Sequence, residues 1–505
     1  MLRKLAKTHW ILFATLFAHW ALFAHYYPEV LMDDMYINIR YADNLYRGLG
    51  LTYNIGEPFE GYSAFLFIIL QAGLRHFTED WFLIAKSLGI GFLTAFIVVF
   101  YFFARRYLDD QRALCLLMGV AAVDPAFVAA GSIGMETSMY LFVTLATVGA
   151  FIAGTKAGRF KIWPLFAVIS ALTRPEGIMF VAILIAAEVL SSYEGLDRAK
   201  TKSYLAKIFT PEKIFVYVLI ASYFFWRCLY YGTLLTGPAV AKSSFLPYSV
   251  TNNYEFWIVK FKALVLLGIA YGIPILSALY FAVRKRRDEC FKFLIIFTTL
   301  YFAFSTVFHG MIIPDTAHFW RYHGQVVPFT ILLAVLGWQL AVRENLRLFG
   351  TALLVVFVVL MVVYRFPKLA AQMERLDSTR TNDPKHYEIA GKMMAELECG
   401  KARQGLKLAT TEAGAPPFFS GLYTIDLLGL NNGDIARFAK DGNLEALKRY
   451  VIDLRPDFFF LFEDMFIYTI FSEFLLANYE VIYDGNGVLL FKDKNLVCEF
   501  SPQPR

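Results

Sequence analysis

From residue 81 to residue 104 the chain reads WFLIAKSLGIGFLTAFIVVFYFFA, with Lys86 as its only charged side chain. A helix needs about 17–25 predominantly apolar residues to cross a bilayer, and this run is long enough. Arg105 and Arg106 follow directly, and short basic connectors are typical of cytoplasmic loops. The run therefore predicts a membrane-spanning helix whose carboxyl end lies on the cytoplasmic side.

Similar apolar runs lie on both sides of this one. They fall near residues 10–27, 113–131, 137–154, 213–231, 257–283, 291–309, 321–341 and 347–364, with shorter pieces near 62–74, 162–173 and 177–191. Hydrophobic residues make up 58% of the chain and charged residues 18%, against about 45–50% and 25% in soluble domains. We expect an α-helical polytopic membrane protein with about 11–13 transmembrane helices. One short segment, either 62–74 or a flank of the break at 173–177, should be interfacial or re-entrant.

The region after about residue 365 has a different pattern, because helix-like and strand-like stretches alternate there. We expect helices at 385–398 and 434–452, strands at 406–410 and 458–462, and a hairpin around residues 484–487. This order predicts a C-terminal soluble α/β domain at 365–505, preceded by a transmembrane domain at 1–364 that carries an extracytoplasmic loop at 28–61. Cys399 and Cys498 could form a disulfide outside the cytoplasm, and two unpaired thiols are an equal alternative.

The first loop is rich in carboxylates. Asp33 and Asp34 come directly after the first apolar run, an amphipathic helix pattern follows from Met35 to Gly48, and Glu57 and Glu60 precede the next apolar piece. Acids at a membrane boundary are costly unless they are paired or hydrated. The Asp pair could provide a general base or bind a divalent cation, although no cofactor is certain. A solvated loop with acids at a helix start is an equal alternative.

Further candidate residues lie at predicted boundaries and breaks. Glu136 lies at the start of an apolar run. Arg174 and Glu176 lie on either side of a proline at a predicted helix break, and we interpret them as an ion pair in preference to a phosphate-binding site. Asp124-Pro125 indicates either a functional acid or a helix break. On the outer side, Lys242, Arg321 and His323 could bind a lipid phosphate or pair with acids of the first loop.

Several functional classes receive no support from the sequence. The net charge of +6 is small, and the basic residues lie in short connectors, so we expect no nucleic-acid partner. The chain lacks a P-loop, a G-x-S-x-G motif, an H-E-x-x-H motif and a Rossmann fingerprint. ATP-driven transport and serine or zinc hydrolysis are therefore not indicated.

Several short motifs occur in order along the chain. They are Asp33-Asp34-x-Tyr-Ile, Arg40-Tyr41-Ala42-x-Asn44, Gly48-x-Gly50-Leu51, Tyr53-Asn54-x-Gly56-Glu57, Glu60-Gly61-Tyr62, Gly134-Met135-Glu136-Thr137, Thr173-Arg174-Pro175-Glu176-Gly177, Tyr231-Gly232 through Ala241-Lys242, the surroundings of Arg321, Glu412-Ala413-Gly414 and Asp426-Leu427-Leu428-Gly429-Leu430. With these motifs the chain resembles the GT-C glycosyltransferases, which use polyprenyl-phosphate-linked sugars, and its first loop resembles their first extracytoplasmic loop. The nearest branch is the family of the mycobacterial terminal arabinofuranosyltransferase.

This resemblance implies a multi-pass enzyme of the cytoplasmic membrane with its active site and C-terminal domain outside. It would transfer a sugar, arabinofuranose by the nearest branch, to a cell-envelope glycan, lipid or protein. Asp33 or Asp34 would be the base, and Lys242, Arg321 and Arg174 would stabilise the leaving phosphate. The other candidate substrate-binding residues are Arg40, Glu57, Glu60, Tyr62, Glu136, Glu176 and His323.

Two rival functions follow from the same features. A lipid-linked-sugar flippase would also have broken helices and charges within the membrane, but it predicts inverted repeats, and we find no internal repeat. An oligosaccharyltransferase or ligase would move a whole glycan instead of one sugar. The size of the substrate cavity would separate that function from single-sugar transfer.

Overall fold

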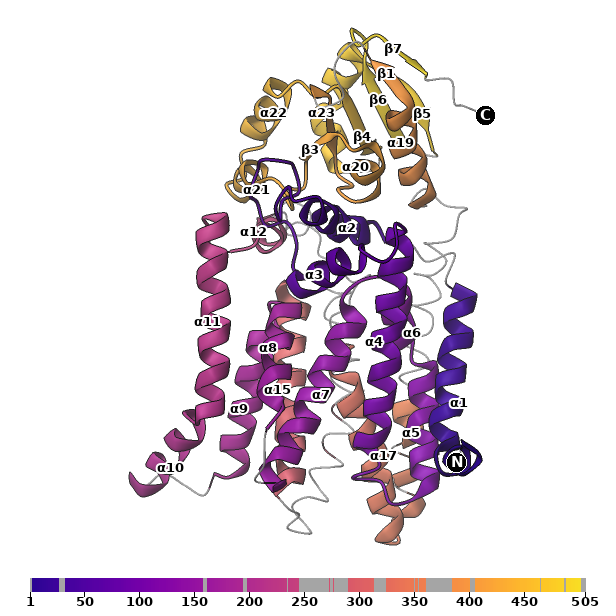
Figure 1. Cartoon of the computed structure of the whole chain (residues 1–505), viewed down its shortest axis with the longest axis vertical. Helices are drawn as coiled ribbons and strands as arrows, with labels where there is room; N and C mark the ends of the chain where they lie inside the picture. The colour runs from indigo at the N-terminus through magenta and orange to yellow at the C-terminus, as the bar shows by residue number, and fades with distance from the viewer. Residues whose placement is uncertain are drawn as a thin grey trace. The chain divides into compact units, whose positions relative to one another are not determined.

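The structure is a computed structural model. It describes residues 2–26, 32–157, 161–193, 198–233, 235–244, 272, 276, 289–312, 324–348, 350–352, 354–359, 384–399, 405–463, 465–485 and 487–500. The chain is an α-helical polytopic membrane protein with a C-terminal region of strands and helices, as the sequence predicts (Figure 1).

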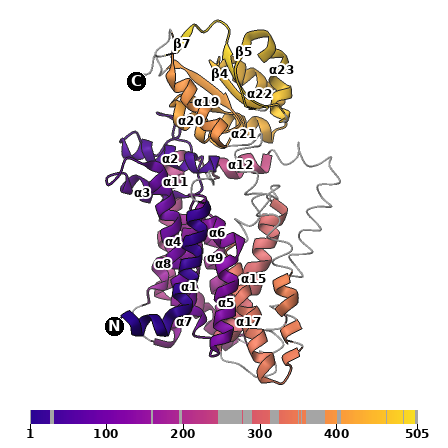
Figure 2. The same ribbon diagram turned by 90° about the vertical axis from the view of Figure 1, so that its right-hand side faces the viewer.

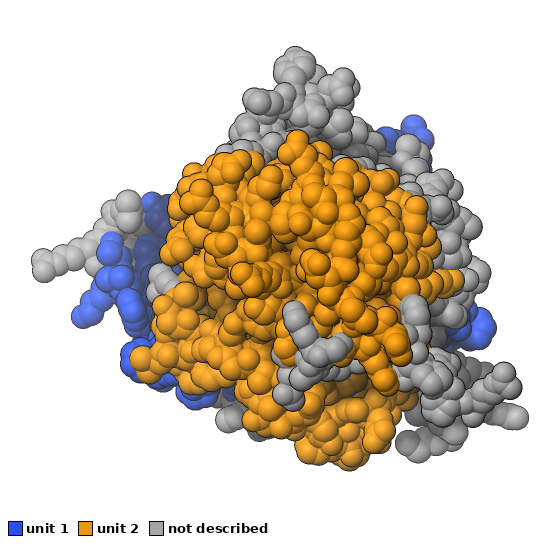
Figure 3. All heavy atoms as spheres, turned by 90° about the horizontal axis from the view of Figure 1, so that it is seen from above, with its two compact units in different colours: residues 1–28, 86–225, 254–371 blue, residues 29–85, 226–253, 372–505 orange. Residues whose placement is uncertain are grey.

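The chain divides into two compact units (Figure 3). The first comprises Met1–Pro28, Lys86–Phe225 and Tyr254–Ala371, and the second comprises Glu29–Ala85, Trp226–Asn253 and Gln372–Arg505. We call the last of these segments the C-terminal region. The first loop thus belongs to the same compact unit as the C-terminal region, and the predicted domain boundary near residue 365 stays a prediction.

The first unit is helical. Its described helices are α1 (Leu2–Tyr26), α4 (Trp81–Ala104), α5 (Gln111–Val123), α6 (Pro125–Ser132), α7 (Thr137–Ala157), α8 (Trp163–Thr173), α9 (Gly177–Ser191), α10 (Arg198–Ile208), α11 (Pro211–Tyr231), α15 (Glu289–Ile312) and α17 (Val327–Arg343). The first residues of α4, up to Ala85, and the last residues of α11, from Trp226, belong to the second unit. Among the described residues, α4, α7, α11 and α15 are long and apolar enough to cross a membrane, and the bent pair α5–α6 would make a fifth span. The expected run at 257–283 lies outside the described residues, apart from two isolated positions.

Two helix breaks in the described part of this unit occur at a residue followed by proline. Arg174 has extended backbone angles (φ −149°, ψ 144°) before Pro175 and ends α8. Asp124 is likewise extended before Pro125, and its Oδ1 accepts the N–H of Ala126 at 2.9 Å, so it caps α6. Proline disfavours the helical conformation of the residue before it. The continuous span expected at 113–131 is therefore broken, and Asp124 marks the break.

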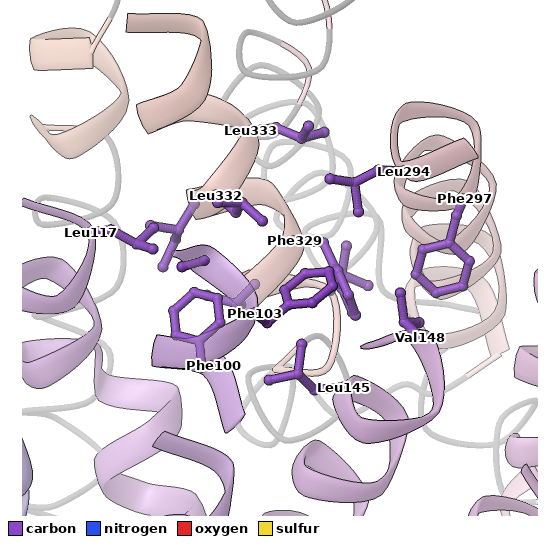
Figure 4. Packing of buried hydrophobic residues seen from close by; sticks show 14 of the residues in the cluster. Phe100, Phe103, Leu117, Leu145, Val148, Leu294, Phe297, Phe329, Leu332 and Leu333 are labelled. Atoms are coloured by element: carbon purple, nitrogen blue, oxygen red, sulfur yellow. The ribbon is translucent and has the colours of Figure 1, made fainter. Parts of the chain in front are cut away.

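Aromatic and aliphatic side chains fill the core of the first unit (Figure 4). Phe329 of α17 lies edge-on to Phe297 of α15, with ring centroids 5.1 Å apart, and to Phe103 of α4 at 6.4 Å. All three side chains are buried. Offset and edge-to-face ring contacts of this kind add to the stabilisation from apolar burial, and here they connect helices far apart in the chain.

The second unit begins with two short helices, α2 (Asp33–Tyr46) and α3 (Phe65–Leu74), which pack against each other. α2 ends just before Gly48, whose positive φ of 74° suits a glycine stop, as the sequence predicts. α3 has ten residues and spans only about 15 Å at 1.5 Å per residue, too short to cross a bilayer. A third helix, α12 (Gly237–Ser244), packs against α21 of the C-terminal region.

The C-terminal region, orange to yellow in Figure 2, contains strands and helices. Its five-stranded mixed sheet has the strand order β3-β2-β4-β6-β5. Its strands are β2 (Lys407–Thr410), β3 (Tyr423–Asp426), β4 (Phe458–Phe462), β5 (Tyr479–Asp484) and β6 (Val488–Asp493). β2 runs parallel to both β3 and β4, whereas β6 pairs antiparallel with β4 and β5. A two-stranded sheet, β1 (Leu397–Cys399) with β7 (Cys498–Phe500), carries a disulfide between Cys399 and Cys498.

Helices cover both faces of this sheet. They are α19 (Pro384–Glu396), α20 (Ala415–Ser420), α21 (Gly433–Lys440), α22 (Leu444–Asp453) and α23 (Phe466–Asn478). On β4, Phe460 meets Tyr387 of α19, whereas Phe459 meets Phe471 of α23. A strand buried on both faces reads as a continuous apolar run, which explains the all-apolar sequence of β4.

The prediction of a single helix at 434–452 is wrong. The structure has two helices there, α21 and α22, separated by a short turn. Gly442 adopts a positive φ of 69°, and the side chain of Asn443 accepts the N–H of Ala446 as an N-terminal cap. A left-handed glycine followed by a capping asparagine ends one helix and starts the next.

Candidate functional site

Asp33, at the start of α2, is held by the C-terminal region. Its Oδ2 accepts the backbone N–H of Gly414 at 2.8 Å, and its Oδ1 accepts that of Ala415 at 2.7 Å. The two helices involved, α2 and α20, lie side by side (Figure 1), and Tyr36 packs its ring against Phe418 and Phe419. Residues almost 400 positions apart thus form one site within the second unit.

Two further acids of the C-terminal region belong to this site. Glu412 follows β2 and Asp426 ends β3, so both lie at the carboxyl edge of neighbouring parallel strands. Ligands of α/β sheets bind at this edge. Asp426 is fully buried and organises the next turn, since it accepts the backbone N–H of Leu428 and both the backbone and side-chain N–H of Asn431.

The environment raises the proton affinity of these acids. Burial raises the pKa of Asp33 to about 7; the two N–H donors oppose this effect, while repulsion from Asp34 adds to it. Burial, with repulsion from Asp33 and Asp34, raises the pKa of Glu412 well above its usual range. Burial also raises the pKa of Asp426 to about 6. A carboxyl with a pKa near neutral can gain or lose a proton at physiological pH.

Arg40 connects the first loop to the C-terminal region. Its guanidinium donates to the carbonyl oxygens of Pro417 and Leu422, each at 2.8 Å, and to that of Tyr53 at 3.0 Å. Longer bonds reach Thr424 Oγ1 at 3.3 Å and Asn54 Oδ1 at 3.4 Å, and the guanidinium carbon lies 4.5 Å from the centroid of the Tyr53 ring. All five N–H groups of a guanidinium are thereby engaged by the protein itself.

The other first-loop candidates also have protein partners. Glu57 is exposed and accepts the hydroxyl of Tyr423 at 2.8 Å. Glu60 is buried, with its Oε2 2.7 Å from Arg227 Nε; burial raises the pKa of Glu60 to about 7, and Arg227 opposes that rise. The hydroxyl of Tyr62 lies 3.0 Å from that of Tyr231.

In the first unit, the candidates Glu136, Arg174 and Glu176 form one buried ion-pair group. Arg174 Nη1 lies 3.2 Å from Glu136 Oε1, and its Nη2 lies 3.1 Å from Glu176 Oε1. Glu136 and Arg174 are almost completely buried. The ion pair expected at this helix break is present.

The structure leaves the outer cations undescribed. Arg321 and His323 lie outside the described residues, and Lys242 lies in α12 but its side chain is likewise outside them. In the part of the chain that the structure does describe, no three His, Cys, Asp or Glu side chains converge closely enough to hold a metal ion.

Sequence reasoning assigned no role of their own to Lys86, Glu412 and Asp426. Lys86 of α4 is fully buried and donates to the carbonyl of Ser132 at the end of α6. The signal for it was present, because Lys86 is the single charge in a membrane-spanning run. Glu412 and Asp426 lay in segments that match the GT-C family, but no pattern within the sequence placed them beside Asp33.

Comparisons with known proteins concern the C-terminal region and the fold. Residues 380–497 match the model of a family described as a domain of unknown function, DUF8728. No curated protein matches the chain in sequence.

Among solved structures, ArnT from Cupriavidus metallidurans bound to undecaprenyl phosphate is similar, with a TM-score of 0.59 and 12% identity over 96% of this chain and 98% of that one. ArnT in the apo state gives the same values. The oligosaccharyltransferase of Archaeoglobus fulgidus, in complex with zinc and sulfate, has a TM-score of 0.54 and 12% identity over 97% of this chain and 74% of that one. The chain therefore has the GT-C fold of these membrane proteins.

Proposed function

We propose that this protein is a membrane glycosyltransferase that moves a sugar from a polyprenyl-phosphate donor to an acceptor hydroxyl, with Asp33 as the general base. The observation that carries the proposal is the Asp33 carboxylate, which is held by two backbone N–H groups at the carboxyl edge of a parallel sheet. The GT-C fold and the undecaprenyl phosphate bound to ArnT support a lipid-linked donor.

Asp33 has the properties that a general base requires. Its pKa of about 7 lies near physiological pH, where a base combines sufficient ionisation with sufficient proton affinity. Each carboxylate oxygen can accept two hydrogen bonds, so one N–H donor on each oxygen leaves room for the acceptor hydroxyl. Asp34 is the adjacent alternative, and it contributes the repulsion that raises the pKa of Asp33.

The leaving phosphate needs cations where negative charge grows in the transition state. We assign this role to Lys242 and Arg321. Arg174 is a weaker candidate than the sequence suggested, because Glu136 and Glu176 already neutralise it. His323, Glu57, Glu60 and Tyr62 keep their proposed roles as substrate-binding residues.

The disulfide of the C-terminal region bears on the compartment. Cys399 and Cys498 are bonded, and disulfides persist in oxidising compartments and are rare in the cytosol. The disulfide supports an orientation in which the second unit, including Asp33, lies on the extracytoplasmic side of the membrane. The family resemblance suggests arabinofuranose as the sugar and a cell-envelope glycan, lipid or protein as the acceptor.

The test replaces Asp33 and Asp34 separately with Asn and measures transfer from radiolabelled polyprenyl-phosphate arabinofuranose to endogenous acceptors in membranes. Loss of a general base lowers the rate by about 10²- to 10⁴-fold. Asp43→Asn is the matched control, since Asp43 lies on the same helix in a solvent-exposed pair with Arg47. Full activity of the Asp33 variant would refute Asp33 as the base, and full activity of both variants would refute a role for either aspartate.

A second candidate function is transfer of a whole glycan, which the similarity to the archaeal oligosaccharyltransferase favours. Mass analysis of the acceptor separates the two functions, because an oligosaccharyltransferase adds the complete glycan in one step. Donor translocation in liposomes without any acceptor would instead indicate a flippase.

A further inference from the structure

We propose that the turn Glu412–Ala415 of the C-terminal region positions Asp33 for catalysis, with Gly414 as the positioning residue. The inference rests on the proposed function for the catalytic role of Asp33. It makes the C-terminal region a required part of the catalytic centre instead of an accessory domain.

Gly414 fits Asp33 so closely that no side chain can replace its hydrogen. A Cβ built at residue 414 would lie 2.5 Å from both Cγ and Oδ2 of Asp33 and would also overlap the Asp33 carbonyl oxygen. Gly414 donates its N–H to the same carboxylate. The absence of a Cβ therefore allows the backbone to approach the carboxylate directly.

The first loop also holds this turn at other points. The Tyr53 hydroxyl donates to the carbonyl oxygen of Ala413, the residue before Gly414. Arg40 stacks on the Tyr53 ring and donates to the carbonyl oxygen of Pro417, two residues beyond Ala415. The turn is thus fixed on both sides of its contact with Asp33, which limits the motion of the carboxylate.

The turn also affects the proton affinity of Asp33. The N–H groups of Gly414 and Ala415 both stabilise the ionised carboxylate and lower its pKa against the opposing effect of burial. Burial and repulsion from Asp33 and Asp34 raise the pKa of Glu412 in the same turn well above its usual range. Losing these two N–H bonds while the carboxylate stays buried should therefore raise the pKa of Asp33.

The decisive variant is Gly414→Ala, with Gly405→Ala as its matched control. Gly405 is exposed, and a Cβ there meets nothing within 4 Å. In Gly414→Ala, amide exchange at residues 414 and 415, whose N–H groups bond to Asp33, should accelerate about tenfold, and kcat should fall about a hundredfold, as expected for a reacting group displaced by about 1 Å. The midpoint of the acidic limb of the kcat profile should rise on the order of one pH unit.

Tyr53→Phe is the second, milder variant, because it removes only the bond to Ala413 and leaves the ring beneath Arg40. It should lower kcat several-fold and move the acidic limb in the same direction. The proposal is overturned if folded Gly414→Ala has the wild-type exchange rate and pH profile. If Gly414→Ala does not fold, wild-type kcat and pH profile in Tyr53→Phe overturn it.

The amide-exchange measurement needs no substrate, so it separates two kinds of failure. Faster exchange in Gly414→Ala together with full activity of Asp33→Asn would refute Asp33 as the base. It would still support the contact between Gly414 and Asp33. An inactive Asp33→Asn with unchanged Gly414→Ala would refute the positioning role alone.

Discussion

Replacing Arg40 should release the first loop from the C-terminal region. Three of its hydrogen bonds reach backbone carbonyl oxygens at 2.8–3.0 Å. A hydrogen bond from a charged donor contributes about 1.5–3 kcal/mol. Each of the three carbonyl oxygens keeps a second donor, so the loss of all three bonds together should cost about 3–5 kcal/mol. We therefore expect Arg40→Ala to lower the local opening free energy of α2 by about that amount. Arg40→Lys should cost less, about 2–4 kcal/mol, since an ammonium keeps the charge but cannot reproduce the planar fork.

Hydrogen–deuterium exchange of the purified protein in detergent measures this effect directly. A loss of about 3–5 kcal/mol corresponds to exchange that is about 10²- to 10⁴-fold faster in the amides of α2. Arg47→Ala is the control, because Arg47 lies just after the same helix, its side chain is 58% exposed and its pair with Asp43 is a surface ion pair, worth about 0–1 kcal/mol. Exchange in Arg40→Ala that matches the control would show that the guanidinium contacts do not hold the loop.

Three further predictions follow from the second unit. If Asp33 is the base, activity should rise with pH through a midpoint near 7, with roughly a tenth of the maximal rate at pH 6; a flat rate between pH 6 and 8 would contradict this. Cys399→Ser removes the disulfide between residues that are 99 positions apart, and it should lower the unfolding free energy of the C-terminal region by about 2–4 kcal/mol. The melting temperature should fall, and a reductant should lower the melting temperature of the wild type in the same way. Gly61→Ala places a methyl group 2.9 Å from a backbone carbonyl oxygen and should lower the unfolding free energy by about 1–3 kcal/mol. Gly73→Ala is the control, because its methyl group meets open space on α3 and should leave the melting temperature unchanged or raise it.

The elements with strong local signals were predictable. The apolar run at 81–104 forms α4 with the same bounds, and the run Phe458–Phe462 forms β4. Apolar length and turn-forming residues act over a few neighbours, so the sequence displays them directly. The expected single helix at 434–452 failed because Gly442 takes a left-handed conformation, and a helix pattern alone does not show whether an internal glycine continues the helix or ends it.

The candidate site was only half predictable. The sequence predicted Asp33 as one of an acid pair at a membrane boundary, and it predicted Arg40 as a substrate-binding residue. The structure gives Arg40 five partners within the protein, from residues 53 to 424. It also brings Glu412 and Asp426 to Asp33, because β2 and β3 are parallel and their carboxyl ends meet at one edge.

The sequence by itself determined that this protein crosses a membrane several times and ends in a region of alternating helices and strands, since apolar length and local periodicity suffice for both. Only the tertiary structure decided that the first loop and the C-terminal region form one unit around Asp33. Contacts between residues almost 400 positions apart depend on strand order and on the close approach of Gly414. Neither of these leaves a periodic signal in the chain, so the pairing of Asp33 with its turn became visible only in three dimensions.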